Sequence, residues 1–172
     1  MRTGISIILV AALSAVAVQT SAQTYPSRSV RIVVPFAPGG STDILARTIA
    51  QRLIDVFGQQ VIVDNRPGAG GNIGADIVAK SPPDGYNLVM GSIGTHATNA
   101  FLYSKMPYDT VKDFIPITQT AIVTLVLVVH PSLPAQSVKE LIALARSKTG
   151  EINYASGGNG ASQHLAGELF KY

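Results

Sequence analysis

Three short blocks of mainly β-branched and apolar residues stand in the first half of the chain, and each has the length of a buried strand. They lie at 30–36 (VRIVVPF), 60–65 (QVIVDN) and 87–92 (NLVMGS). Between the first two blocks, apolar residues recur every three or four positions from Ile44, and Gly58 follows them, which predicts a helix closed by a glycine. A glycine-rich loop and a shorter helical pattern separate the second block from the third. Strands that alternate with helices predict an α/β fold whose parallel sheet is covered by helices on both faces.

The hydrophobic pattern changes in the second half of the chain. A long extended stretch runs over 115–132, and a helix is expected from Ser137, because Ser137 and Glu140 stand at the spacing of a capping box. A short block at 152–156 (INYAS) predicts a further strand, and a glycine-rich turn with a helix follows over 157–172. We therefore expect the chain to cross from one lobe into another.

The pattern divides the chain into three expected parts. Residues 1–22 form a leader, 23–116 a first α/β lobe, and 117–172 part of a second α/β lobe. The last predicted helix still runs at Tyr172, and no following element covers its apolar positions. We expect the second lobe to be incomplete and the chain to be a piece of a longer protein. Such a piece on its own is expected to dissolve poorly and to bind ligand weakly.

The N-terminus has the pattern of a secretory signal. A cation at Arg2 precedes an apolar stretch from Ile5 to Val18, and small residues follow at Thr20 and Ala22. The apolar stretch is shorter than the roughly 20 residues that a membrane span needs, although a retained anchor is the alternative. We expect cleavage after Ala22 and an exported protein.

Composition narrows the classes of partner. The chain has 13 Lys and Arg against 10 Asp and Glu, a net charge of +3, and the expected loss of Arg2 makes the balance closer still. Without a basic run, no nucleic-acid partner is expected. Cysteine is absent, which excludes disulfides and thiolate chemistry.

Two segments share the order strand, glycine-rich turn, Ser or Thr, helix, and they fall in different expected lobes. They are 33–43 (VVPFAPGGSTD) and 153–164 (NYASGGNGASQH). The amides of a first helical turn have no intrahelical acceptor, and the helix dipole there favours negative charge. Two such turns predict a cleft for an anion. The alternative is that residues 41–43 and Ser162 only cap their own helices.

Other glycine and serine motifs do not fit this chain. A phosphate-binding P-loop needs a Gly-Lys pair, and no Lys follows Gly39 or Gly40. The glycines of 68–74 (GAGGNIG) miss the dinucleotide fingerprint by one position, and no serine stands in a G-x-S-x-G sequence. We expect neither a nucleotide cofactor nor a nucleophile elbow.

The titratable residues show no catalytic or metal-binding arrangement. The three histidines, His96, His130 and His164, lack metal-ligand spacing, so no metal is expected. His130 is interpreted as a boundary residue, whereas His96 and His164 follow glycine turns and could face the cleft. Asp43 could cap its helix, hold a water or accept a hydrogen bond from a ligand amine. No second titratable partner is evident, so we expect no enzyme activity.

Three stretches in succession, 25–53, 61–99 and 152–170, resemble the Bug-type extracytoplasmic solute receptors, the substrate-binding proteins of tripartite tricarboxylate transporters. The resemblance extends over residues 25–172. It implies a two-lobed periplasmic-binding-protein fold (Venus-flytrap, type II-like) that closes around a small organic acid, such as a tricarboxylate or dicarboxylate, and needs no cofactor. It also implies a periplasmic location and a partnership with the membrane permease subunits of the transporter. Family members are considerably longer than this chain.

The resemblance also implies which residues bind the ligand carboxylate. They come from two glycine-rich loops and from the end of the third predicted strand: Ala37, Pro38, Gly39, Gly40, Thr42, Asp43, Ser92, Thr95, His96, Ser156, Gly157, Gly158, Asn159, Gly160 and Ser162. Two alternatives stay open at this point. The receptor could serve a signalling partner in place of a permease, or the chain could be an exported α/β hydrolase or oxidoreductase.

Overall fold

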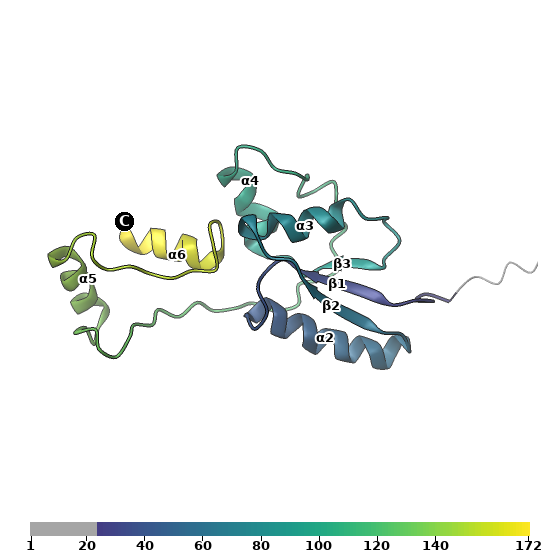
Figure 1. Ribbon diagram of the computed structural model, residues 1–172, viewed down its shortest axis with the longest axis horizontal. Coiled ribbons are helices and arrows are strands. Elements are labelled where there is room, and N and C mark those ends of the chain that lie inside the picture. Colours follow the sequence, from purple (N-terminus) through teal and green to yellow (C-terminus); the bar gives the residue numbers. More distant parts are fainter. Residues whose placement is uncertain (1–23) are drawn as a thin grey trace, which may run out of the picture.

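The computed structural model describes residues 24–172. The predicted leader and its cleavage after Ala22 lie outside the described residues. No helix in the described part is long and apolar enough to cross a membrane. The described residues fall into a first region, residues 24–114, and a second region, residues 115–172 (Figure 1).

The first region is built on a parallel sheet. Its strands are β1 (Val30–Val34), β2 (Val61–Asn65) and β3 (Asn87–Val89), in the order β2-β1-β3. The three predicted strands are therefore confirmed. The central position of β1 explains its almost uninterrupted apolar sequence, because both of its faces are covered.

Two helices cover the two faces of this sheet (Figure 1). Helix α2 (Ser41–Phe57) packs Ala46 and Ala50 into the core cluster with alternate residues of β1. It ends at Gly58, which has a φ of 63° and whose N–H donates a hydrogen bond to the Ile54 carbonyl oxygen, as the predicted glycine closure requires. Helix α3 (Asn72–Ala79) covers the other face. At Gly74 a Cβ would lie 2.8 Å from the Cα of Pro35, so only glycine permits this approach.

Shorter helical turns complete the first region at the carboxyl edge of the sheet. The turn η1 (Ala69–Gly71) precedes α3, and the π-helical turn η2 (Gly94–Thr98) continues directly into α4 (Asn99–Leu102). These turns lie beside the N-terminus of α3, next to the site expected from the sequence (Figure 1).

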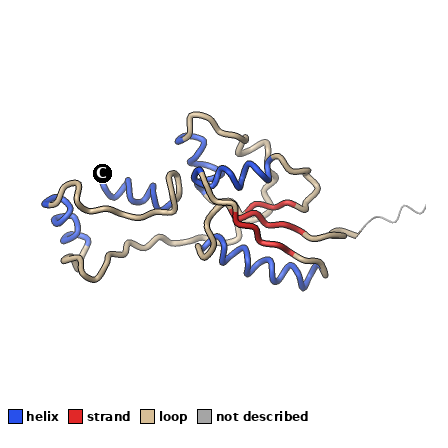
Figure 2. Tube along the Cα trace, viewed as in Figure 1, coloured by secondary structure: helices blue, strands red, loops and turns tan. Residues whose placement is uncertain are grey.

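The second region is an extended segment followed by two helices (Figure 2). Helix α5 (Val138–Ser147) begins at the predicted Ser137, whose Oγ accepts from the Glu140 amide. The return bond of the predicted capping box is shifted by one residue, because Glu140 Oε2 accepts from the Gln136 amide and not from the Ser137 amide. Helix α6 (Ser162–Lys171) follows the second glycine-rich loop.

One strand expected in the second region is not formed. Residues 152–156 have no strand structure, and the extended stretch 115–130 has none either. A strand is defined by hydrogen bonds to a neighbouring strand, and within residues 24–172 neither stretch is paired in a ladder. The prediction of a strand at 152–156 was therefore wrong for this structure. Of the stretch 115–132 expected to be extended, 115–130 runs extended (Figure 2), whereas 131–132 belong to a turn.

Candidate functional site

The first glycine-rich loop connects β1 to α2 at the carboxyl edge of the sheet. Residues 37–41 are exposed, and Gly39 adopts a φ of 87° that favours glycine. The N-cap of α2 is Gly40, and no side chain caps this helix. The alternative that Ser41, Thr42 or Asp43 serves as the N-cap is therefore wrong. The first intrahelical bond runs from the Ile44 amide to the Gly40 carbonyl, so the amides of residues 41–43 have no intrahelical acceptor.

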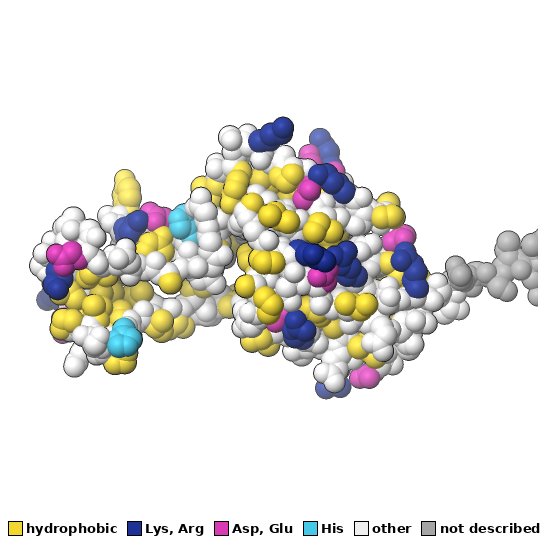
Figure 3. Space-filling model, in the orientation of Figure 1, with side chains coloured by type: hydrophobic (Ala, Val, Ile, Leu, Met, Phe, Trp, Pro, Cys, Tyr) yellow, Lys and Arg dark blue, Asp and Glu magenta, His cyan; other side chains and the backbone are white. Residues whose placement is uncertain are grey.

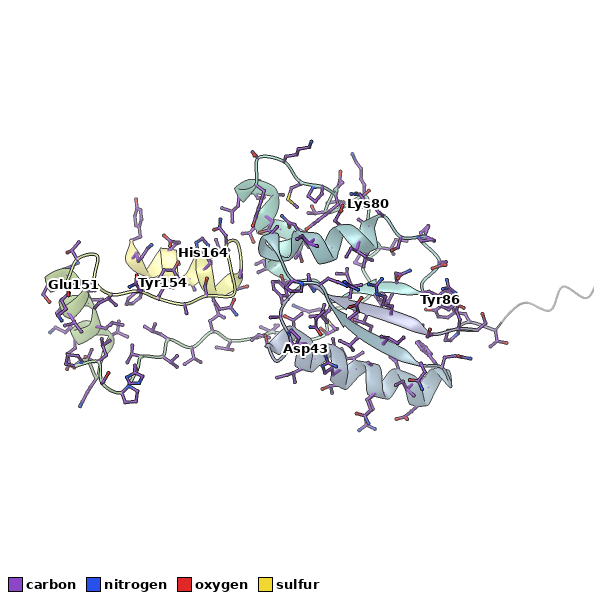
Figure 4. All side chains as sticks on the ribbon, viewed as in Figure 1. Asp43, Lys80, Tyr86, Glu151, Tyr154 and His164 are labelled. Atoms are coloured by element: carbon purple, nitrogen blue, oxygen red, sulfur yellow. The ribbon has the colours of Figure 1, made fainter. Side chains whose placement is uncertain are left out.

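Asp43 is the residue that fixes this loop. Its carboxylate accepts hydrogen bonds from the Gly39 amide (2.9 Å), from Arg47 Nε (3.0 Å) and from Asn65 Nδ2 (3.0 Å). Only 3% of Asp43 is exposed. The Arg47 guanidinium, with help from the Gly39 amide and the Asn65 side chain, lowers the pKa of Asp43 to about 2. Asp43 lies at the start of α2 and ties the loop to the end of β2 (Figure 4).

The arginine side chains near this edge of the sheet are all engaged in ion pairs with aspartates. Arg47 binds Asp43 and Asn65. Arg66 binds Asp64, which also binds Arg31. An anion at the loop would therefore meet backbone amides and hydroxyl groups and not an unshared guanidinium.

The segment Ser92–His96 follows β3 and forms a turn that is held by hydrogen bonds among its own residues. Thr95 is fully buried, and its Oγ1 accepts from the Ser92 amide (3.0 Å) and lies 2.8 Å from His96 Nδ1. The His96 ring packs edge-on against Phe114, and burial lowers the pKa of His96. Ser92 and His96 are both partly exposed, while Thr95 supports the turn from inside.

The second glycine-rich loop precedes α6. Ser156 Oγ accepts from the Gly158 amide, and His164 Nδ1 accepts from the Gly160 amide (3.3 Å each). The N-cap of α6 is Ala161, so the cap role considered for Ser162 is wrong. Gly157 and Gly158 are exposed, whereas Gly160 is buried.

The structure brings the second loop against the Ser92–His96 segment. A Cβ placed on Gly94 would lie 2.9 Å from the Gly160 carbonyl oxygen and 3.4 Å from Ser92 Oγ. The first loop joins the same edge through Phe36, whose ring contacts the position of Gly71 beside Thr95. The three groups of expected site residues thus lie at one edge of the sheet, although their contact with a ligand stays a prediction.

A buried polar network behind this edge was not predicted from the sequence. The Tyr108 hydroxyl lies 2.9 Å from Asn72 Oδ1 and 2.7 Å from the Thr95 carbonyl oxygen, and burial raises the pKa of Tyr108 to about 12. Asn99 Nδ2 donates to the same Asn72 oxygen at 2.7 Å. Two of these residues, Asn72 and Asn99, follow glycine-rich or small-residue stretches, but isolated asparagines gave no signal of their own.

The described residues hold no cluster of three or more His, Asp or Glu side chains that could bind a metal ion. The site therefore consists of backbone amides, hydroxyls and glycine turns held by buried polar side chains. This arrangement offers hydrogen-bond donors to an anion. Its hydroxyl–imidazole pair, Thr95 with His96, does not present a nucleophile, because Thr95 is fully buried.

Comparison with known proteins identifies the family. The sequence profile of TctC, described as "Tripartite tricarboxylate transporter family receptor", matches residues 45–172. The chain belongs to this family. The resemblance to Bug-type receptors is thereby confirmed, and membership of a receptor family supports a binding protein over an enzyme.

Individual relatives agree with this assignment. Protein BugT of Bordetella pertussis is 43% identical over 161 residues, which cover 93% of this chain and 49% of BugT. Among solved structures, R. palustris Rpa4515 with adipate has a TM-score of 0.77 at 44% identity. The match covers 86% of this chain and 49% of the Rpa4515 chain. MatC of Rhodopseudomonas palustris with bound malate has a TM-score of 0.74 at 33% identity. The match covers 86% of this chain and 51% of the MatC chain. The chain thus has the fold of a periplasmic binding protein and spans about half the length of these relatives.

Proposed function

We propose that this chain forms the ligand-capturing part of a periplasmic receptor for a small carboxylate. The observation that carries the proposal is the start of α2. The loop that leads into it is exposed over residues 37–41, no side chain caps the helix, and Asp43 holds the loop through the Gly39 amide. Unsatisfied amides at a helix N-terminus together with the helix dipole suit a carboxylate oxygen.

The neutral character of the site fits a receptor that must also release its ligand. Arg47 and Arg66 are paired with Asp43 and Asp64, so a bound carboxylate gains hydrogen bonds without an unshared cation. Two relatives with adipate and malate bound support the chemical class of the ligand. For this chain we infer the same class, a dicarboxylate or tricarboxylate.

The family description supports delivery of the ligand to a membrane transporter. We propose that the partners are the permease subunits of a tripartite tricarboxylate transporter. We also propose that the protein reaches the periplasm through the signal at 1–22, cut after Ala22. The lobe boundaries 23–116 and 117–172 belong to the same proposal.

A proline at position 41 tests the role of the helix amides. Ser41 is the first residue of α2, where proline is tolerated, and Gly40 before it has the extended conformation (φ −76°, ψ 167°) that a following proline requires. Ser41→Pro removes one amide donor and leaves the helix intact. Since a hydrogen bond to a charged group contributes about 1.5–3 kcal/mol, we expect adipate or malate affinity to fall about 10- to 100-fold.

The matched control is Ser41→Ala, which removes the hydroxyl and keeps the amide. Titration calorimetry measures the affinity of wild type, Ser41→Pro and Ser41→Ala, each without the signal, for adipate, malate and citrate. Equal affinity of Ser41→Pro and wild type would show that the start of α2 does not hold the carboxylate. A folded wild type that binds none of the three acids would contradict the proposed ligand class.

A further inference from the structure

The second glycine-rich loop touches the first region through its backbone. Tyr103 donates a hydrogen bond from its hydroxyl to the Asn159 carbonyl oxygen (3.3 Å). The Gly160 carbonyl oxygen lies directly over Gly94. In Figure 1 the tip of the loop before α6 lies beside the η2–α4 turn of the first region.

Three glycines make this contact possible. A Cβ on Gly94 would come within 2.9 Å of the Gly160 oxygen. A Cβ on Gly70 would overlap the Asn159 oxygen and lie 2.9 Å from the Tyr103 hydroxyl. A Cβ on Gly160 would overlap Asn99 Oδ1. The two surfaces therefore approach more closely than side chains would allow.

Asn99 stands at the centre of the contact. It is fully buried, and its Nδ2 donates to the Gly70 carbonyl (3.0 Å) and to Asn72 Oδ1 (2.7 Å). Its Oδ1 has no hydrogen-bond partner among the described residues and faces Gly160. A buried oxygen without a partner costs free energy, so its orientation toward the second loop calls for an explanation.

We propose that this contact is a glycine seat that docks the second loop on the first region and holds the two regions together. The seat consists of Gly70, Gly94, Asn99 and Tyr103 on one side, with Asn159 and Gly160 on the other. Asn99 is its positioning residue: one end of the amide fixes the η1 turn through Gly70, and the other end meets Gly160. When the loop lifts off, water reaches Asn99 Oδ1 and the exposed carbonyls, which makes the open state accessible as well.

The seat rests on the proposed function in one respect, because it assumes that closure of the two regions serves ligand capture. If only closed molecules bind, the apparent dissociation constant rises in proportion to the loss of the closed fraction. A substitution that lowers the closed fraction tenfold therefore lowers the affinity for a carboxylate about tenfold, without touching the helix amides of the first loop.

The first experiment measures the seat without any ligand. The chain contains no cysteine, so Gln51→Cys on α2 and Lys139→Cys on α5, both exposed, accept a pair of spin labels. We expect a narrow distance distribution between the labels in the otherwise unchanged protein. Gly160→Ala should broaden this distribution or shift it to longer distances, because its methyl group occupies the position of Asn99 Oδ1.

Gly158→Ala is the matched control. Gly158 and Gly160 both have positive φ values, 110° and 86°, so alanine strains the backbone at either position. A Cβ on Gly158, however, has nothing within 4 Å. Broadening in Gly160→Ala but not in Gly158→Ala supports the seat. Equal broadening in both would assign the effect to loop strain and overturn the proposal, as would a broad distribution in the unsubstituted protein or no change in Gly160→Ala.

Gly94→Ala supplies a second test from the opposite surface. Alanine normally stabilises a helical position relative to glycine, so the first region should stay folded, which circular dichroism verifies. We expect the same broadening as in Gly160→Ala and about the same loss of adipate affinity; an unchanged distribution would contradict the seat. If the distances respond as expected but no protein binds adipate, the proposed ligand fails and the seat stands. If adipate binds equally to all variants and the distances stay unchanged, the seat fails and the proposed function stands.

Discussion

Two apolar stretches of this chain have opposite surroundings. The sequence VRIVV of β1 is buried between α2 and α3, whereas AIVTLVLVV at 121–129 is exposed along its whole length. Val33 is 0% exposed, while Val126 is 76% exposed. Figure 3 shows hydrophobic side chains gathered on the surface beside α5 in the second region. The difference teaches that apolar sequence predicts burial only where neighbouring elements are present to cover it.

The largest expected effect comes from placing a charge in each stretch. Val33→Asp buries a carboxylate without a partner and should lower the free energy of unfolding by about 3–5 kcal/mol. Val126→Asp places the same carboxylate in water and should change the free energy of unfolding by no more than about 0.5 kcal/mol. Urea unfolding followed by circular dichroism measures both. Similar losses in the two variants would mean that residues 121–129 are buried in solution and would remove the contrast between the regions.

A second comparison concerns two helix starts that use the same device. Asp43 in α2 and Glu140 in α5 are both the third residue of their helix, and each accepts from the amide of the residue before the N-cap, Gly39 or Gln136. Asp43 is buried and has Arg47 as a further partner, whereas Glu140 is exposed. The carboxylate in the first region is therefore the one expected to govern stability against acid.

The pH dependence follows from the sign of the Asp43 shift. Its pKa is lowered from 3.8 to about 2 in the folded protein, so the stabilisation is complete above about pH 5 and is lost as the pH falls toward 2. We expect Asp43→Asn to unfold at a higher pH than wild type on acidification, with the two stabilities converging near pH 2. Glu140→Gln should follow wild type closely. Urea midpoints at pH 7, 4, 3 and 2 test this; an identical acid profile for Asp43→Asn and wild type would contradict it.

The sequence was sufficient for the first region because its signals are local. The apolar blocks, the spacing after Ile44 and the closing Gly58 each act within a few residues, and all three strands and α2 formed as predicted. The strand expected at 152–156 failed because a ladder depends on a partner that local pattern does not provide.

The sequence predicted the glycine-rich turns of the candidate site, but it did not predict the polar side chains that hold these turns in place. Glycine turns before α2 and α6 are visible in the sequence, since Gly39 and Gly160 mark positions of positive φ. The roles of Asn65, Asn99 and Tyr108 depend on contacts between residues far apart in the chain. No pattern of residue types distinguishes such an asparagine from one that merely ends a strand or helix.

The smallest expected effect comes from two glycines with left-handed backbone, one in each region. Gly58 (φ 63°) closes α2, and Gly150 (φ 83°) follows α5; a Cβ on either would meet nothing within 4 Å. Alanine thus adds only backbone strain, about 1 kcal/mol at each position. Because α2 packs on the sheet, Gly58→Ala should lower the global free energy of unfolding by that amount. The exposed second region can relax locally, so Gly150→Ala should leave the urea midpoint unchanged. Equal shifts in both variants would show that the two regions unfold as one cooperative unit, and the contrast between them would then concern exposure alone.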